Sequence, residues 1–431
     1  MVDFITNQKP KSRFGVLWRD PGFLKLWIGQ TISEIGSRIT RDGVPYTAVI
    51  VLGAKPEQMG FLTAVGAASV LLFGLLAGVW VDRLRRRPIM IAADLARAAI
   101  LLTIPIAALL HRLSMAHLYG VIALTGFCTV FFDVAYQSYL PSLVERENLL
   151  EGNSKLGMSA AAAEIAGPSL TGILVQLITA PIAILFDAIS FLFSALCVSL
   201  IRKPEPIHPP PPTSHHPREE TIAGLRFVFH HPLLRPIAGF WLTMYFSIGF
   251  VGPLYVLFAI RELRMSPAEL GVVIAMGGVG AMIGATVAPV IGKRLGVGRT
   301  LIGSAFTIML AYALIPLAHG PVALAMAFLF AQQLFGDTAF MTLHVAELTL
   351  RQSVTPESVL GRVNAAMQLA TRGVLPLGAL TGGVLAASFG IRATLTMTVF
   401  GLLLATVWLV TSPVRKLRET PSQPDAQVAA Q

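Results

Sequence analysis

Long apolar stretches alternate with short polar ones along almost the whole chain. Each stretch holds about 20 mostly apolar residues, which is the length that crosses a bilayer as a helix. Twelve such runs occur, near residues 23–53, 59–81, 88–110, 116–138, 155–178, 180–201, 236–260, 266–291, 300–318, 321–344, 364–388 and 392–411. Glycine and proline are frequent within them, as they are in membrane helices. The pattern predicts an all-α membrane protein with twelve transmembrane helices.

The composition agrees with a membrane protein. Of the 431 residues, 54% are hydrophobic and only 13% are charged, whereas soluble domains carry about 25% charged residues. A formal net charge of +10 is also found in proteins that bind nucleic acid. Here, however, the basic residues lie in short loops between apolar runs, as membrane topology requires. We therefore expect no nucleic-acid partner.

The distribution of lysine and arginine predicts the orientation. Because the number of spans is even, both termini lie on one side of the membrane. That side holds 24 lysine and arginine residues, whereas the opposite side holds five, namely Lys55, Arg112, Arg261, Arg264 and Arg392. Loops on the cytoplasmic side carry the excess of positive charge. We expect both termini to be cytoplasmic.

The two halves of the chain correspond at an offset of 211 residues. Gly167 falls on Gly378 and Gly172 falls on Gly383. Six predicted spans separate the matched positions, so the repeats run parallel, as in transporters that rock around a substrate held between two halves. We expect four segments: a six-helix half at 1–202, a cytoplasmic Pro-rich linker with an amphipathic stretch at 203–231, a second six-helix half at 232–412, and a disordered cytoplasmic tail at 413–431.

The turn between the second and third runs is densely charged. It reads Gly78-Val-Trp-Val-Asp82-Arg83-Leu-Arg85-Arg86-Arg87-Pro88. Charges cost several kcal/mol in hydrocarbon, so this segment must be a tight turn in water. Its counterpart in the second half has Lys293 where the repeat would place Asp82.

The pattern Gly78-x-x-x-Asp82-Arg83-x-x-Arg86-Arg87 resembles the loop signature of the major facilitator superfamily. Three stretches narrow the resemblance to the bacterial macrolide-efflux and enterobactin-exporter branch: 78–98, 131–144 and 351–364. The resemblance covers nearly the whole chain. It implies the major facilitator fold of two parallel six-helix repeats, in a bacterial cytoplasmic (inner) membrane. Arg85 departs from the family, which usually has a small residue there.

The resemblance also implies that the signature holds the cytoplasmic side closed when the carrier faces outward. Asp82 follows a helix C-terminus, where a negative charge is unfavourable, and would be stabilised by the N-terminus of the helix near residue 364. Arg83 or Arg87 would pair with Asp133, and Gly78 would permit close helix approach. The alternative is that the arginines are topology signals only.

A polar stripe runs through the first apolar stretch. It consists of Gln30, Glu34, Arg38, Arg41 and Asp42, on roughly one helix face. Each charge costs roughly 2.5–3.5 kcal/mol at the bilayer centre, so such residues face a bundle interior or water. We predict a cavity wall that contacts substrate, with Glu34 or Asp42 as a candidate proton carrier. The alternative is a ladder of Glu34–Arg38 and Arg38–Asp42 pairs that only holds the span in place.

Three further charges within apolar stretches are candidates for the same cavity. Glu164 precedes Gly167-Pro168, at a place where exporters of the resembled family often carry a Gly-Pro motif. Arg372 lies near the level of Glu164 in the other half, and Asp337 is a second acid candidate. For Glu164 and Arg372 a structural role is an equal alternative.

The chain has no phosphate-binding Walker loop, no His-Glu-x-x-His pair and no Gly-x-Ser-x-Gly motif. We therefore expect no enzyme activity, no cofactor and no metal site, and an ion gradient as the energy source. The intramembrane acids favour protons. We predict a monomeric, proton-coupled exporter of a small amphipathic organic molecule (drug, siderophore or metabolite), which works by a rocker-switch mechanism in the lipid bilayer. An importer on the same scaffold, or a sensor or assembly factor that docks through the linker, are the alternatives.

Overall fold

The computed structural model describes residues 15–81, 84–203 and 217–419. Within these ranges all regular structure is helical. The helices are α1 (Pro21–Tyr46), α2 (Pro56–Val81), α3 (Arg86–Leu109), α4 (Met115–Leu143), α5 (Leu149–Ile178), α6 (Ala180–Ser199), α7 (Pro217–His230), α8 (Leu234–Leu257), α9 (Pro267–Leu295), α10 (Val297–Leu317), α11 (Val322–Val354), α12 (Glu357–Arg372), α13 (Leu375–Phe389) and α14 (Ile391–Val410).

These helices account for the twelve predicted spans. Ten helices in the described ranges are long and apolar enough to cross a membrane, and α13 is a shorter apolar helix. The charged residues of α1 make this helix less apolar than those ten. The predicted run at 364–388 is divided between α12 and α13, with Gly373 and Val374 between them. Pro376 explains the break, because it cannot donate the backbone hydrogen bond that would continue α12.

The predicted repeat is confirmed by the backbone. Both α1 and α8 pass into a short π-helix, η2 (Thr47–Val51) and η4 (Phe258–Glu262), and these two segments lie 211 residues apart. Thr179 precedes α6 with φ 86°, and Gly390 precedes α14 with φ 89°. The α6 and α14 bounds also differ by 211 at both ends. The two six-helix halves are therefore parallel copies of one unit.

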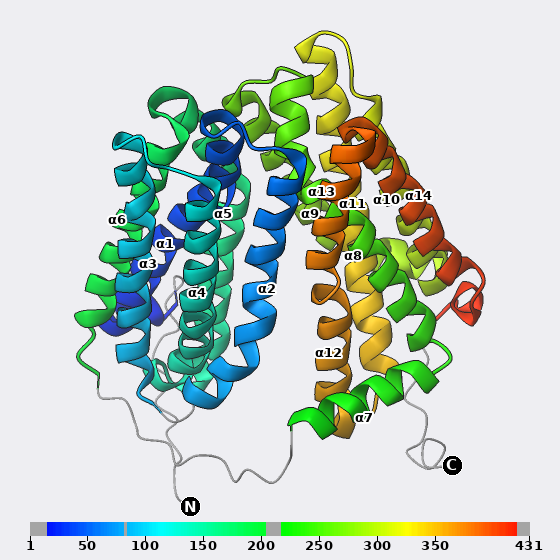
Figure 1. Ribbon diagram of the computed structural model, residues 1–431. Helices are drawn as coiled ribbons and strands as arrows, with labels where there is room; N and C mark the ends of the chain where they lie inside the picture. The colour runs from blue at the N-terminus through cyan, green and yellow to red at the C-terminus, as the bar shows by residue number, and fades with distance from the viewer. Residues whose placement is uncertain (1–14, 82–83, 204–216, 420–431) are drawn as a thin grey trace, which may run out of the picture.

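We call the end of the bundle where α1 begins and α14 ends the terminal side, and the opposite end the far side. Helix α7 lies across the terminal side and packs on α12 (Figure 1), where Gly224 meets the backbone of Arg362. The 3-10 helices η1 (Leu17–Arg19) and η5 (Pro413–Lys416) belong to the same side. The predicted linker at 204–216 lies outside the described residues.

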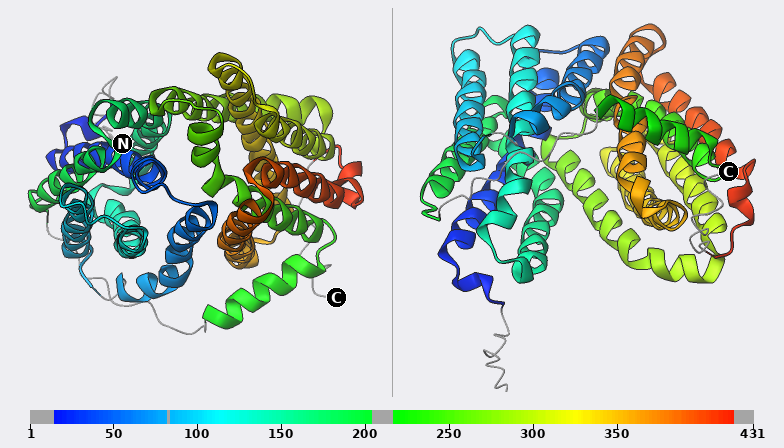
Figure 2. Two further views of the ribbon diagram at one scale, coloured as in Figure 1. Left: turned by 45° about the horizontal axis from the view of Figure 1, so that its top comes forward. Right: turned by 90° about the horizontal axis from the view of Figure 1, so that it is seen from below.

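The two halves contact one another at the far side, through α5 with α9 and α2 with α13. Only glycine permits these approaches: a Cβ on Gly172 would lie 2.2 Å from the carbonyl oxygen of Pro267, and one on Gly60 would lie 2.6 Å from that of Ala379. Toward the terminal side α2 and α12 diverge (Figure 1), and Figure 2 shows two separate bundles. The far side is thus the closed side.

Candidate functional site

A cavity of about 540 Å³ lies between the two halves. Helices from both halves line it, including α1, α2, α8 and α11. Its polar wall contains Arg41, Asp42, Thr63, Tyr255, Tyr312, Gln332 and Gln333, and most other lining side chains are apolar. A mostly apolar cavity of this size with a few polar groups is typical of small-molecule sites.

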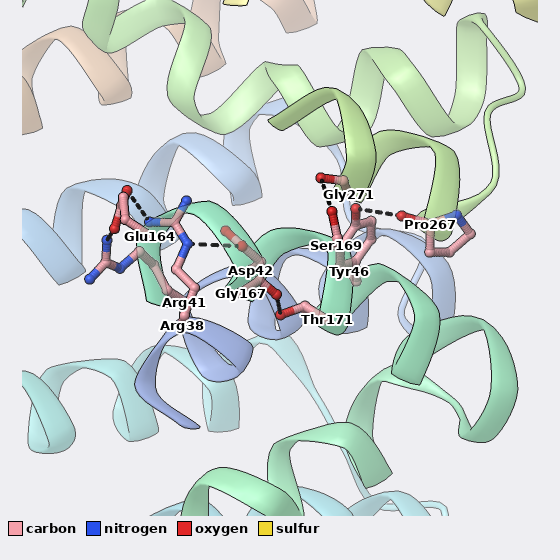
Figure 3. A network of polar contacts seen from close by, with 10 residues as sticks. All are labelled: Arg38, Arg41, Asp42, Tyr46, Glu164, Gly167, Ser169, Thr171, Pro267 and Gly271. Carbon is pink, nitrogen blue, oxygen red and sulfur yellow. Dashed lines mark hydrogen bonds and ion pairs between the residues drawn. The ribbon is translucent and has the colours of Figure 1, made fainter. Parts of the chain in front are cut away.

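Four charged side chains from α1 and α5 form a cluster at this cavity (Figure 3). Arg38 is its centre: Nε lies 3.2 Å from Oδ2 of Asp42, and Nη1 lies 2.6 Å from Oε1 of Glu164. Nη1 of Arg41 lies 3.4 Å from Oε2 of Glu164. Two cations and two anions therefore balance one another. We call these four residues the charge cluster.

The charge cluster has a buried part and an open part. The side chains of Arg38 and Asp42 are 11% and 15% exposed, whereas those of Arg41 and Glu164 are 60% and 52% exposed. Charges taken out of water depend on their partners more than exposed ones do. The Arg38–Asp42 pair therefore fixes the cluster, and the Arg41–Glu164 side can exchange partners with a ligand or with water.

Gly167 on α5 makes room for the arginine. A Cβ at Gly167 would lie 2.2 Å from Cγ of Arg38, so the aliphatic stem of Arg38 rests on the bare α5 backbone. Glu164 is one helical turn before Gly167 and is thereby placed beside the guanidinium group. The hydroxyl of Thr171 donates to the carbonyl oxygen of Gly167, so its proton is not directed at Arg38.

The same two helices carry the contacts that close the far side. The hydroxyl of Tyr46 donates to the carbonyl oxygen of Pro267 at 3.2 Å, and that of Ser169 donates to the carbonyl oxygen of Gly271 at 3.5 Å (Figure 3). Tyr46 is one helical turn beyond Asp42 on α1. A change in the charge cluster can therefore act on the inter-half contact through a single turn of helix.

A family model for the Major Facilitator Superfamily matches residues 26–375 and 242–430. The chain belongs to the major facilitator superfamily. It is thus a multi-pass membrane transporter by family, as the loop signature predicts.

Two relatives of this superfamily member align over nearly their full length. The uncharacterized MFS-type transporter YfiS of Bacillus subtilis is 27% identical over 409 residues, which cover 93% of this chain and 94% of the relative. The enterobactin exporter EntS of Escherichia coli O127:H6 is 26% identical over 411 residues, which cover 94% and 95%. Among solved structures, a bacterial homologue of the iron transporter ferroportin in an inward-facing state is similar in fold, with a TM-score of 0.72 and 19% identity over 90% of this chain and 98% of that one.

Two residues of the predicted stripe on α1 lie apart from the charge cluster. The amide of Gln30 is buried and donates to Oγ of Ser194 on α6 at 3.3 Å, so it faces the interior of its own half. The predicted Glu34–Arg38 pair is not among the ion pairs of the described residues, because Arg38 forms ion pairs with Asp42 and Glu164 instead.

Of the acid and base predicted for the second half, only the acid, Asp337, has a described side chain. The carboxylate of Asp337 on α11 lies against Gly277 of α9, where a Cβ would be 2.4 Å from Oδ2. This places Asp337 at a helix contact within its own half. Arg372 is the last residue of α12, and its side chain lies outside the described residues.

The predicted gate is described only in part. Gly78 lies in the last turns of α2, and Asp82 and Arg83 lie outside the described residues. The guanidinium group of Arg87 donates to the carbonyl oxygens of Val198 at 3.1 Å and Ser199 at 2.5 Å.

In this conformation the Arg87 guanidinium group lies at the C-terminal end of α6, and the pairing of Arg83 or Arg87 with Asp133 stays a prediction. The C-terminal carbonyls of α6 compete for the cation, since a helix C-terminus attracts positive charge. Asp133 is exposed on α4, and its electrostatic neighbours are Arg97 and Glu34.

Sequence reasoning missed a buried ion pair in α3. Arg97 pairs with Asp94, which is fully buried, and its guanidinium carbon lies 4.0 Å from the ring centroid of Phe191 and 4.3 Å from that of Phe132. Such contacts stabilise a desolvated cation. An acid and a base three residues apart inside an apolar run are the signal that would have found this pair.

Proposed function

We propose that this transporter exports a small amphipathic organic molecule, such as a drug, siderophore or metabolite, in exchange for protons. The observation that carries the proposal is the cavity between the halves, which joins an apolar wall to the charge cluster. An amphipathic molecule would place its apolar part against α8 and α9 and its polar part near Arg41 and Asp42.

In this proposal the charge cluster couples protons to the rocking of the halves. Protonation of Asp42 or Glu164 removes one of the two negative charges that Arg38 holds. The freed guanidinium can then bind the other carboxylate or a substrate oxygen. Because α1 and α5 also carry the far-side contacts to α9, the exchange shifts the balance between the two access states.

We propose further that the terminal side is cytoplasmic, so that the cavity opens toward the cytoplasm in this conformation. The excess of lysine and arginine on that side supports this orientation. A cavity that loads from the cytoplasm suits an exporter, and one relative bears the name of an exporter.

Everted membrane vesicles test the coupling. An amphipathic substrate added to vesicles with an imposed pH gradient should dissipate that gradient, and Asp42→Asn or Glu164→Gln should lower the rate at least about tenfold. Glu145→Gln, which removes an exposed charge outside the site, is the matched control. If no compound in a broad panel dissipates the gradient, proton antiport is wrong. Lower cellular accumulation after deletion of the gene would instead indicate an importer.

Cysteine labelling tests the orientation. Arg112→Cys lies between α3 and α4 at the far side, and Arg146→Cys lies between α4 and α5 at the terminal side. A membrane-impermeant maleimide should label the first variant in intact cells and the second only in everted vesicles. The reverse result would invert the proposed topology and the direction of export.

Replacement of 204–217 by a Gly/Ser linker should leave transport intact, whereas a docking protein would lose its activity.

A further inference from the structure

A second cavity, of about 400 Å³, lies within the C-terminal half. We call it the recess. Its lining comes from α8, α11 and α12 and includes Trp241, Tyr245, His344, Glu347, Arg351 and Asn364. Tyr245 is one helical turn from Ile248, which lines the central cavity. The recess is therefore a neighbour of the proposed transport site on its terminal side.

The recess contains two buried acceptor atoms without a hydrogen-bond donor. Glu347 is only 2% exposed, and its Oε1 has no hydrogen-bond partner. Oδ1 of Asn364, across the recess on α12, is buried and unpartnered as well. A buried polar atom without a partner costs roughly 1–3 kcal/mol, and more if it is charged. Nε of Arg351, 3.4 Å from Oε1 of Glu347, is a buried donor without a hydrogen-bond partner. The two acceptors outnumber this donor, so the cavity favours a ligand that donates hydrogen bonds.

The aromatic rings beside the Glu347 carboxylate favour a cationic donor. Arg351 approaches Glu347 only through Nε, at 3.4 Å from Oε1, without a hydrogen bond of normal geometry. The ring of Trp241 lies beside His344 and Tyr245, with centroids 6.0 and 5.5 Å apart. Aromatic rings beside a carboxylate are the usual surroundings of an ammonium group.

The repeat supports a specific function for this place. At an offset of 211 residues, Glu347 corresponds to Tyr136 and Arg351 corresponds to Leu140. The fold therefore does not need an ionic pair at these positions, since the N-terminal half builds the same helix with an aromatic and an aliphatic residue. Burying the charges of Glu347 and Arg351 costs desolvation free energy that the neutral residues avoid, and this indicates a binding role for the pair.

We propose that the recess binds a protonated organic amine, whose ammonium group donates to Oε1 of Glu347 and Oδ1 of Asn364 and lies against Trp241. The inference rests on the proposed function only for the fate of the amine, which would be a substrate on its way to the central cavity. Binding itself can be measured without transport.

Equilibrium dialysis with the purified full-length protein tests the recess. The probes are 2-phenylethylamine and 2-phenylethanol, which have the same number of heavy atoms but differ in charge. The amine should bind at least about tenfold more tightly than the alcohol, because a charge-assisted hydrogen bond is roughly twice as strong as a neutral one. Glu347→Gln should remove this preference.

Glu357→Gln is the matched control, because it makes the same charge change at an exposed residue of α12. If Glu347→Gln fails to fold, Asn364→Leu serves instead, and it should weaken amine binding a few-fold without affecting the alcohol. Equal binding of amine and alcohol, or unchanged amine binding in a folded variant, would overturn the proposal. Loss of amine binding in Asp42→Asn but not in Glu347→Gln would place the amine in the central cavity and also overturn it. The vesicle assay tests export separately.

Discussion

Positions 38 and 249 are equivalent in the two halves, yet one is an arginine and the other a glycine. On α1 the stem of Arg38 lies over Gly167 of α5. On α8 the backbone of Gly249 itself lies against Gly378 of α13, the equivalent of Gly167, and a Cβ on Gly249 would be 2.8 Å from the Gly378 Cα atom. In one helix pair a charged side chain lies over the glycine, and in the other the two backbones are in contact.

This difference teaches how a duplicated fold divides its tasks. The bare helix surface at Gly167 and Gly378 is common to both halves, but only the N-terminal half uses it to hold a buried cation. In the C-terminal half the ionic pair lies nearer the terminal side, at Glu347 and Arg351. Each half therefore has an ion pair at positions where the equivalent residues of the other half are neutral.

The largest expected effect comes from the same substitution at the two equivalent glycines. Gly378→Ala places a Cβ 2.3 Å from the carbonyl oxygen of Phe246, which belongs to the α8 backbone and cannot move alone. We expect a destabilisation of about 1–3 kcal/mol or more, seen as lower folded yield and a lower Tm in detergent. Gly167→Ala meets the side chain of Arg38, at 2.2 Å from Cγ and 2.8 Å from Cβ, so it should lower Tm by less than Gly378→Ala and should reduce transport. Equal loss of Tm in both variants would contradict the comparison.

The second prediction separates the buried and open parts of the charge cluster. Arg38→Gln leaves Asp42 without its partner, and breaking such a buried pair costs about 3 kcal/mol. Arg41→Gln removes an exposed pair with Glu164, which is worth about 0–1 kcal/mol. Thermal unfolding should show a clear drop for the first variant and little change for the second. The double variant Arg38→Gln with Asp42→Asn should recover part of the stability, and failure to do so would assign the effect to packing.

The third prediction concerns the ends of the last helix in each half. Arg87 binds the C-terminal carbonyls of α6, whereas at the equivalent position Gly298 lets the carbonyl oxygen of Val414 approach to 2.1 Å from where a Cβ would lie. Arg87→Met should raise amide hydrogen exchange at 196–203, with a loss of about 1–2 kcal/mol. Gly298→Ala should raise it at 411–418 instead. Exchange that rises at neither segment would show that these contacts do not fix the helix ends.

The smallest effect is a pH dependence at the start of α8. Asp20 and His231 occupy equivalent positions, and each accepts hydrogen bonds from two backbone N–H groups: Asp20 from Gly22 and Phe23, and His231 from Leu233 and Leu234. Partial burial lowers the pKa of His231 below its ordinary value, which is about 6.5. The neutral ring is therefore the form that the fold favours.

The stability contributed by His231 is complete above the unfolded pKa of about 6.5 and is lost as the pH falls through the lower, folded pKa. We expect the Tm of the unchanged protein to decline slightly between about pH 6.5 and 5. This decline should be smaller than the changes in Tm expected for the variants above. His231→Asp copies the cap of the other half and should abolish the His231 part of this decline. An unchanged pH profile in His231→Asp would show that the cap does not titrate in this range.

The predicted spans follow the helices closely because membrane insertion depends on local composition. In the described ranges the helix bounds confirm the parallel repeat and the positions of the predicted apolar runs. The break in the eleventh span was missed, since Pro376 in an apolar run does not by itself distinguish a kink from a break. Of the predicted cluster, the Arg38–Asp42 pair was within reach of the sequence because its partners are four residues apart on one helix.

The sequence by itself determined where the chain enters and leaves the membrane, since a charge is excluded from hydrocarbon wherever its partner lies. The tertiary structure decided which partner each charge has. Arg38 and Glu164 are 126 residues apart, and Glu34 was an equally good partner by spacing. The choice was made by the bare surface of Gly167, which brings α5 close to α1 and turns the arginine toward Glu164. Helix packing depends on the surfaces of both helices in contact, and the sequence of one helix describes only one of these surfaces.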